Sequence, residues 1–237
     1  KEAVAEGAHA PLPAAKPTKR GTFAPKAAAS ERKNKNWDNS FRWVGERMGT
    51  TEGGVYMDKD TGRKSYIKFP GEKRAAAEYL ANKLYSLAGV DVAAVSIISL
   101  QGKPAIKSDL LPGESLGEDG ELPSSVLDEV RDGFAIDAWL ANWDVVGLEY
   151  DNLFVNDKDG KVYRIDPGGS LDFRAQGALK RFGPKVGELR TLRDSDINPE
   201  AADVFEDVTD KNMQVGKKTL EKITDRQIRG VVNSTVG

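Results

Sequence analysis

The chain has 237 residues, of which 39% are hydrophobic and 30% charged, and this length allows one large domain or two small lobes with a buried core. It contains no cysteine and a single histidine, which excludes a disulfide framework, thiolate zinc sites, cysteine nucleophiles, Ser-His-Asp catalysis and sites with several histidines. No apolar run approaches the roughly 20 residues that cross a bilayer, so no membrane span is predicted.

The formal net charge of −2 is unevenly distributed. Residues 1–36 hold eight Lys or Arg and three Asp or Glu, a net charge of +5, so the rest of the chain carries −7. This segment is rich in alanine and proline without helical or strand periodicity, which predicts an extended basic arm. Basic residues dispersed in this way are more typical of a solvated tail than of a nucleic-acid-binding arm, so nucleic acid is not the expected partner, and the arm could instead lie along the surface of a protein partner. Because the chain begins with Lys1, we also expect a processed product or a piece of a longer protein.

Residues 37–112 predict a β-rich N-terminal lobe. The Asp58–Gly62 turn joins two strands into a hairpin with glycines in its approach. Pro70–Gly71 then stops the second strand, and apolar residues at helical spacing before Gly89 predict a helix. The expected elements are a short helix or turn at Trp37–Val44, strands at Gly49–Met57 and Lys64–Phe69, a helix at Glu72–Leu87, and strands at Val92–Leu100 and Pro104–Leu111.

Residues 113–237 predict a second lobe that is mostly helical, which makes the fold class α+β. A polar loop is expected over Glu114–Ser125. Beyond it, Gly133 weakens the helical pattern within a long apolar segment. The expected elements are a helix at Val126–Asn142, a hairpin formed by Leu153–Asn156 and Lys161–Ile165, and helices that start near Asn198 and Thr224.

Four residues of the first lobe are candidates for phosphate chemistry. Gly53 and Gly54 could let backbone N–H groups approach phosphate oxygens, because glycine has no Cβ, although a plain tight turn is the alternative. Lys68 lies in an apolar strand, where a buried ammonium group needs an anionic partner, and a lysine that reaches solvent is the alternative. Glu78, on the following helix, could orient Lys68 by an ion pair or could simply face solvent.

Three further polar residues surround the second hairpin. Asp144 follows the end of the predicted helix, Asn152 begins the hairpin and Asp166 ends it. Strand pairing brings Asn152 and Asp166 together, and two oxygen ligands on adjacent strand ends, completed by water and phosphate oxygens, suit Mg²⁺. Turn capping is the ordinary role of such Asp and Asn residues. Their order after a strand lysine and a helix glutamate is what favours nucleotide chemistry.

In this order of residues the sequence resembles the atypical protein-kinase-like group that contains the phosphatidylinositol 3/4-kinases, the actin-fragmin kinase and HipA-type bacterial kinases. It looks closest to kinase-like domains of bacterial and phage proteins. The resemblance covers roughly residues 49–173 and implies a two-lobed protein-kinase-like fold that uses ATP and Mg²⁺. It rests on the segments 65–70 (SYIKFP), 77–90, 144–152 and 164–169 (RIDPGG).

The resemblance implies a catalytic role for each polar residue. Lys68 would contact the α- and β-phosphates, and Glu78 would pair with Lys68. Asp144 would accept the proton of the substrate hydroxyl. Asn152 and Asp166 would hold Mg²⁺.

The resemblance also implies where the nucleotide lies. Gly53 and Gly54 would cover it, and the hinge residues Asp109, Leu110 and Leu111 would offer backbone groups along the adenine edge.

The sequence departs from the family pattern around the catalytic loop. Seven residues separate Asp144 from Asn152, and the histidine of the lipid-kinase loop is absent. The longer loop leaves Asp151 as a competitor for a metal or base role. Asp166 is followed by Pro167 where the family usually has Phe, which questions the usual flip of that segment.

Two functions therefore stay open. One is an ATP- and Mg²⁺-dependent phosphotransferase that acts on a protein or a small hydroxylated substrate in the bacterial cytoplasm. The other is a non-catalytic kinase-like structural or binding component, such as a phage virion or head protein, which the basic arm and the altered loop suggest. A self-modifying kinase is a third reading, with Ser170, Thr191 and Ser195 as the available hydroxyl groups.

Overall fold

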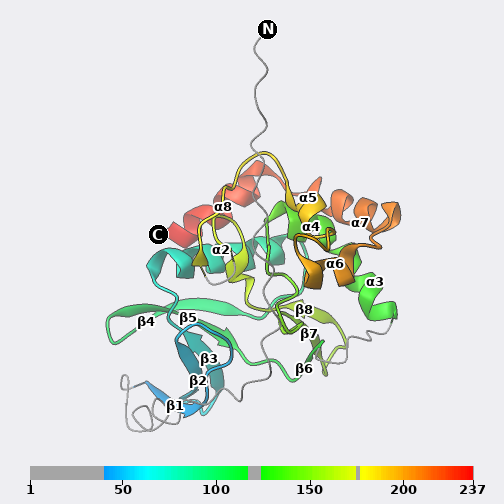
Figure 1. Cartoon of the computed structure of the whole chain (residues 1–237). Coiled ribbons are helices and arrows are strands. Elements are labelled where there is room, and N and C mark those ends of the chain that lie inside the picture. Colours follow the sequence, from blue (N-terminus) through cyan, green and yellow to red (C-terminus); the bar gives the residue numbers. More distant parts are fainter. Residues whose placement is uncertain (1–39, 117–123, 175–176, 237) are drawn as a thin grey trace.

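The computed structural model describes residues 40–116, 124–174 and 177–236, so the predicted arm of residues 1–36 lies outside the described residues. A β-sheet forms the N-terminal part of the described chain, and helices dominate the C-terminal part (Figure 1). The predicted α+β class is therefore confirmed. Within the described ranges no helix has the length and apolar character needed to span a membrane.

The N-terminal sheet contains five antiparallel strands in the order β1-β2-β3-β5-β4. The predicted hairpin turn is confirmed, because Oδ1 of Asp58 accepts hydrogen bonds from the amides of Asp60 (3.0 Å) and Thr61 (2.8 Å), and Gly62 has a left-handed φ of 70°. The strands are β1 (Phe41–Gly45), β2 (Gly53–Asp58), β3 (Lys64–Lys68), β4 (Val95–Leu100) and β5 (Lys103–Asp109).

Strand β1 replaces the short helix or turn expected at the aromatic entry. Phe41 pairs with Asp58 and Trp43 pairs with Tyr56 on the neighbouring strand. Both aromatic rings pack against the core that Tyr56 and Ile67 form on one face of the sheet. The aromatic residues thus occupy a pleated, half-buried surface, which suits their side chains better than a turn does.

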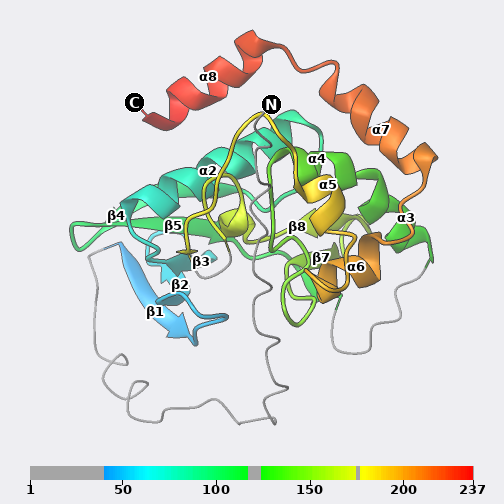
Figure 2. The same cartoon turned by 45° about the horizontal axis from the view of Figure 1, so that its top comes forward.

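Helix α2 (Glu72–Leu87) has the predicted bounds, and Gly89 follows it with a left-handed φ of 72°. One face packs on the sheet, where Ala75 joins Val95 and Ile106. The other face carries Tyr85 into a core shared with the C-terminal helices. Figures 1 and 2 show α8 lying along α2 on the side away from the sheet. Helix α2 is therefore held by both lobes.

The C-terminal lobe has two differences from the predicted pattern. The single helix expected over Val126–Asn142 is divided at Gly133, where an added Cβ would lie 2.5 Å from the Arg164 guanidinium group. A short strand that pairs with β7 occupies part of the expected polar loop. The elements are β6 (Gly113–Ser115), α3 (Ser124–Asp132), α4 (Phe134–Trp139), β7 (Leu153–Asn156), β8 (Val162–Arg164), η1 (Pro167–Gly169), α5 (Glu188–Thr191), α6 (Pro199–Phe205), α7 (Asp210–Leu220) and α8 (Asp225–Val236).

A buried polar network joins α2, α4 and β8. Arg164 Nη2 pairs with Asp137 Oδ2 at 2.8 Å, and both residues are almost fully buried. The Tyr85 hydroxyl donates to Asp137 Oδ1 and accepts from Asn142 Nδ2, each at 2.9 Å. Because the buried charges have hydrogen-bonded partners, the network is tolerated in the core, and it restricts the side chains around it to one arrangement. It fixes the ends of α4 and β8, from which the candidate site extends.

Candidate functional site between the two lobes

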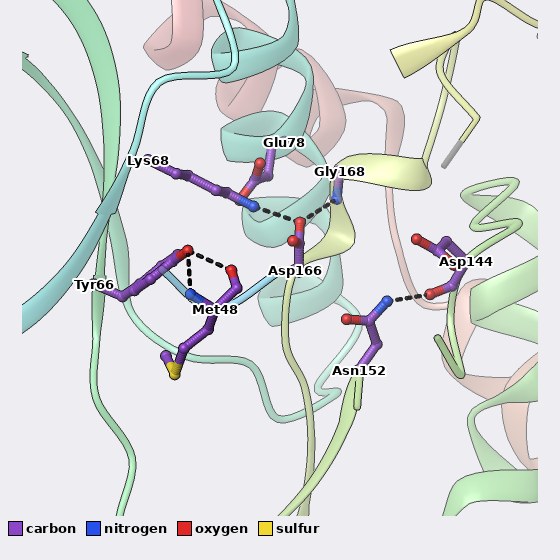
Figure 3. A network of polar contacts seen from close by, with 8 residues as sticks. All are labelled: Met48, Tyr66, Lys68, Glu78, Asp144, Asn152, Asp166 and Gly168. Atoms are coloured by element: carbon purple, nitrogen blue, oxygen red, sulfur yellow. Dashed lines mark hydrogen bonds and ion pairs between the residues drawn. The ribbon is translucent and has the colours of Figure 1, made fainter. Parts of the chain in front are cut away.

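The Lys68 ammonium group joins three elements. It lies at the end of β3, only 5% exposed, and its Nζ is 2.9 Å from Glu78 Oε1 on α2. It also forms an ion pair and hydrogen bond with Asp166, which follows β8 (Figure 3). Burial alone would lower the pKa of Lys68, but the charges of Asp166 and Glu78 outweigh burial and raise this pKa above its ordinary value. Lys68 therefore stays charged and does not reach solvent.

Glu78 lies on the buried face of α2, with 3% of its surface exposed. Burial raises the pKa of its carboxyl to about 7, against the opposing charge of Lys68. The predicted ion pair is thus present, and the alternative of a solvent-facing glutamate does not hold. A carboxyl in this environment depends on the ammonium group of Lys68 for its charge.

Asp166 is placed by a strained backbone turn. Its φ of 48° and ψ of 58° lie in the left-handed region, and it caps η1 by accepting a hydrogen bond from the amide of Gly168 at 3.4 Å. Desolvation opposes ionisation of its carboxyl, but Lys68 and the Gly168 amide lower the pKa below its ordinary value. The side chain is 51% exposed. A charged and accessible carboxylate therefore stands at the junction of the lobes.

Asp144 lies across from this network (Figure 3). Burial raises the pKa of its carboxyl to about 7, and the nearby charges of Asp166 and Asp151 add to the increase. Gly169 lies directly against it, since a Cβ added there would be 2.7 Å from the Asp144 Cβ. A carboxyl whose pKa is near neutrality can accept a proton at physiological pH.

Asn152 and Asp166 lie at adjacent strand ends, as the hairpin pairing predicts. Leu153 pairs with Arg164, and the amide of Ile165 donates to the carbonyl of Asn152 at 2.9 Å. Asn152 Nδ2 donates to the backbone carbonyl of Asp144 at 2.7 Å, which turns the amide oxygen toward the side of Asp166 (Figure 3). The amide thereby links the loop of Asp144 to the hairpin.

The donor set of Asn152 and Asp166 fits Mg²⁺. Within the described part of the chain no hydrogen bond uses Asn152 Oδ1 or Asp166 Oδ2, so one oxygen of each side chain remains for a cation. The same residues include no cluster of three or more His, Cys, Asp or Glu that could hold a metal by itself. Mg²⁺ usually takes only one or two carboxylates from the protein and fills its shell with water and phosphate oxygens.

Gly53 and Gly54 do not form the tight turn of the alternative interpretation, and their contact with phosphate stays a prediction. Both lie inside β2, and Gly53 stands opposite Lys68 in the sheet. A Cβ at Gly53 would lie 2.4 Å from the carbonyl oxygen of Ile67, and one at Gly54 would lie 2.5 Å from Trp43 Nε1. Close packing of neighbouring chain segments therefore requires these glycines.

Residues 46–52 form the loop between β1 and β2. Tyr66 holds it, because its hydroxyl accepts from the amide of Met48 at 3.1 Å and also donates to the Met48 carbonyl (Figure 3). Beside the loop is a hollow of about 400 Å³ lined by Thr50, Thr51, Glu52, Phe69, Pro70 and Arg74. The sequence predicted a strand over Gly49–Met57, whereas Gly49 lies in this loop with a left-handed φ of 82°.

Asp109, Leu110 and Leu111 lie where the two lobes are connected. Asp109 ends β5 opposite Ser65, and its amide donates to the carbonyl of Ala94 at 2.9 Å. Leu110 is 37% exposed. The segment thus connects β5 to β6, and its role as a hinge and its contact with adenine stay predictions.

The three hydroxyl groups suggested for self-modification differ in accessibility. Ser170 is 1% exposed, and its Oγ is buried, as is Oγ1 of Thr191. Ser195 is exposed. Of the three, only Ser195 has a hydroxyl open to a phosphate donor in this conformation.

No protein-family model matches the sequence, and no curated protein matches it. Among solved structures, the chain is similar to the Helicobacter pylori proinflammatory kinase CtkA, with 12% identity and a TM-score of 0.46 over 83% of this chain and 96% of that chain. It is also similar to the Mycobacterium tuberculosis PknI kinase domain, with 11% identity and a TM-score of 0.39 over 76% of this chain and 96% of that chain.

Proposed function

We propose that this chain is an ATP- and Mg²⁺-dependent phosphotransferase of the atypical protein-kinase-like group, acting on a hydroxyl group of a protein or a small molecule. One observation carries the proposal. The ammonium group of Lys68 on the sheet binds a carboxylate from α2, Glu78, and another from the segment after β8, Asp166. Phosphoryl transfer depends mainly on positioning and on neutralising phosphate charge, and this network places a fixed cation between the two lobes.

Each residue of the site has a distinct task in this reaction. Lys68 binds phosphate oxygens, and Glu78 holds its ammonium group in place. Asp144 accepts the proton of the attacking hydroxyl group, for which a pKa of about 7 is well suited. Asn152 and Asp166 would hold Mg²⁺, which supplies positive charge to the phosphates when it is bound.

A non-catalytic kinase-like component remains the second candidate. The packing of Gly53 and Gly54 favours it, because the close approach of neighbouring chain segments already accounts for glycine at both positions without a phosphate contact. In that case the chain would serve as a binding or structural part, for example in a virion. As an enzyme we place it in the bacterial cytoplasm, and residues 1–36 remain a proposed contact for a protein partner.

Turnover of ATP by the purified chain tests the proposal. We expect ADP formation that requires Mg²⁺ and falls at least about 100-fold in Asp166→Ala and in Asp144→Asn, because each removes a charged group from the reacting centre. Asp196→Ala is the matched control, since Asp196 is an exposed carboxylate on a loop outside the site. Intact-mass analysis of the same samples detects phosphate transferred to the chain itself. Turnover that is unchanged in Asp166→Ala would overturn the assignment, and Mg²⁺-dependent binding of ATP without turnover would favour the non-catalytic candidate.

A further inference from the structure

Lys180 is a cation that turns inward without a carboxylate partner. It lies in the segment between η1 and α5, and its Nζ donates to the carbonyl oxygen of Gly169 at 2.7 Å and to the carbonyl oxygen of Ala141. Among the described residues, no carboxylate oxygen lies within ion-pair distance of this nitrogen. An ammonium group that is partly removed from water and paired only with carbonyl dipoles costs folding free energy. Such an arrangement calls for a functional reason.

The two carbonyl groups belong to the two segments that carry the reacting carboxylates. Ala141 lies three residues before Asp144, and Gly169 lies three residues after Asp166. The segments also contact each other directly, because the amide of Trp143 donates to the same Gly169 carbonyl at 3.3 Å. Lys180 thus brings a third segment of the chain to this contact, and its ammonium group bridges the other two segments.

The backbone at one of these carbonyls is strained. Ala141 has a φ of 51°, in the left-handed region that a residue with a Cβ seldom adopts. Such a conformation persists only where surrounding contacts hold it. The contacts here include the hydrogen bond from Lys180, the bond from the amide of Leu171 to the carbonyl of Leu140 at 2.8 Å, and the bond from the amide of Ala141 itself to the carbonyl of Ala138 at 3.0 Å.

We propose that Lys180 is a positioning residue, whose ammonium group holds the Asp144 segment against the Asp166 segment and so sets the spacing between the proton acceptor and the metal-binding carboxylate. The roles of the two carboxylates rest on the proposed function, whereas the link between the segments does not. This role could not be predicted from the sequence, because a lysine in a polar segment ordinarily faces solvent.

The charges around Lys180 give the proposal a distinctive pH dependence. Burial lowers the pKa of Lys180 to about 8. Among the neighbouring charges, Glu188 on α5, Asp172 and Asp144 favour the charged form of Lys180, and Arg174 opposes it. The folded state releases this proton before the unfolded state does, so the contribution of Lys180 to stability rises between about pH 8 and about pH 10.5. If the ammonium form positions the site, turnover falls as the pH rises through about 8, because turnover depends on the folded-state pKa alone. A merely structural lysine would not make activity and stability change in opposite directions.

The test compares Lys180→Met, Lys180→Arg and the control Lys185→Met in the full chain, because Lys185 is exposed on the same segment. The first readout is hydrogen exchange at the amides of Trp143 and Leu171. We expect exchange there to rise at least about tenfold in Lys180→Met, to be partly restored in Lys180→Arg and to be unchanged in Lys185→Met. Unchanged exchange in Lys180→Met would overturn the proposal whether or not the chain is an enzyme.

The second readout is kinetic. We expect Lys180→Met to bind ATP with Mg²⁺ within about threefold of the wild type while kcat falls at least about tenfold, because only the spacing of the reacting groups has changed. Equal kcat in the two proteins would refute the positioning role. If the wild type neither binds nor turns over ATP, the proposed function fails, and hydrogen exchange alone decides on the link. If Lys180→Met does not fold, the wild-type pH profile decides, since turnover that does not fall between about pH 7 and about pH 9 contradicts the proposal.

Discussion

Replacement of Asp144 by Asn should stabilise the protein at neutral and alkaline pH while it abolishes turnover. The carboxyl of Asp144 is partly buried beside two other carboxylates, and burial with these charges raises its pKa from 3.8 to about 7. Ionising it therefore costs more in the folded state than in the unfolded state. Asn keeps the size and polarity of the side chain but carries no charge.

The magnitude follows from the difference in pKa. A difference of about 3 units corresponds to an upper limit of about 4 kcal/mol at about pH 8, where the carboxyl is ionised in both states. Because the side chain is only partly buried, solvent screens the repulsion, and we expect a gain of about 1–3 kcal/mol. For a chain of this size the gain corresponds to an increase in Tm of about 3–10 °C.

Thermal unfolding at about pH 8 and about pH 5 checks this expectation. The folded-state pKa is raised, so the destabilisation by Asp144 grows as pH rises from about 4 to about 7, and the gain at about pH 5 should be less than half of the gain at about pH 8. Asp196→Asn is the control and should change stability by less than about 0.5 kcal/mol at either pH. A lower Tm for Asp144→Asn at about pH 8, or a gain independent of pH, would refute the reasoning.

Two further variants test the packing and charges around the site. Lys68→Met should destabilise the fold by about 3–5 kcal/mol, because it leaves Glu78 buried without its cation, and addition of Glu78→Gln should recover part of this loss in denaturant unfolding. The prediction fails if the two substitutions are additive. Gly53→Ala should cost about 1–3 kcal/mol because its Cβ would press on the carbonyl of Ile67, whereas Gly187→Ala, with open space around it, should be close to neutral by the same measurement. Equal effects of the two alanines would contradict the packing account.

Local signals allowed much of this fold to be predicted. The stop at Pro70–Gly71 and the glycine at position 89 lie next to α2 in sequence, so its bounds were predicted correctly. The second hairpin is likewise a local structure, and its pairing places Asn152 beside the residues that precede Asp166. Features of this kind depend on neighbours along the chain, which the sequence displays directly.

Features that depend on distant segments could not be predicted in this way. Strand β1 is defined by pairing across a loop, and β6 by pairing with β7 some 40 residues later, so neither has a clear local pattern. The glycine at position 53 is visible in the sequence, but the strand that approaches it is not. The position of the Lys180 side chain depends on the backbone carbonyl groups of Ala141 and Gly169. Every residue has such a carbonyl group, so the sequence does not show which ones a lysine will bind.

Calorimetric titration of ATP with Mg²⁺ into the wild type and into Asp166→Ala tests the central claim most directly. The site described here predicts saturable binding that disappears when Mg²⁺ is chelated, is lost in Asp166→Ala and is retained in Asp196→Ala. Absence of binding to the wild type, or equal binding to wild type and Asp166→Ala, would contradict a nucleotide site built on Lys68, Asn152 and Asp166.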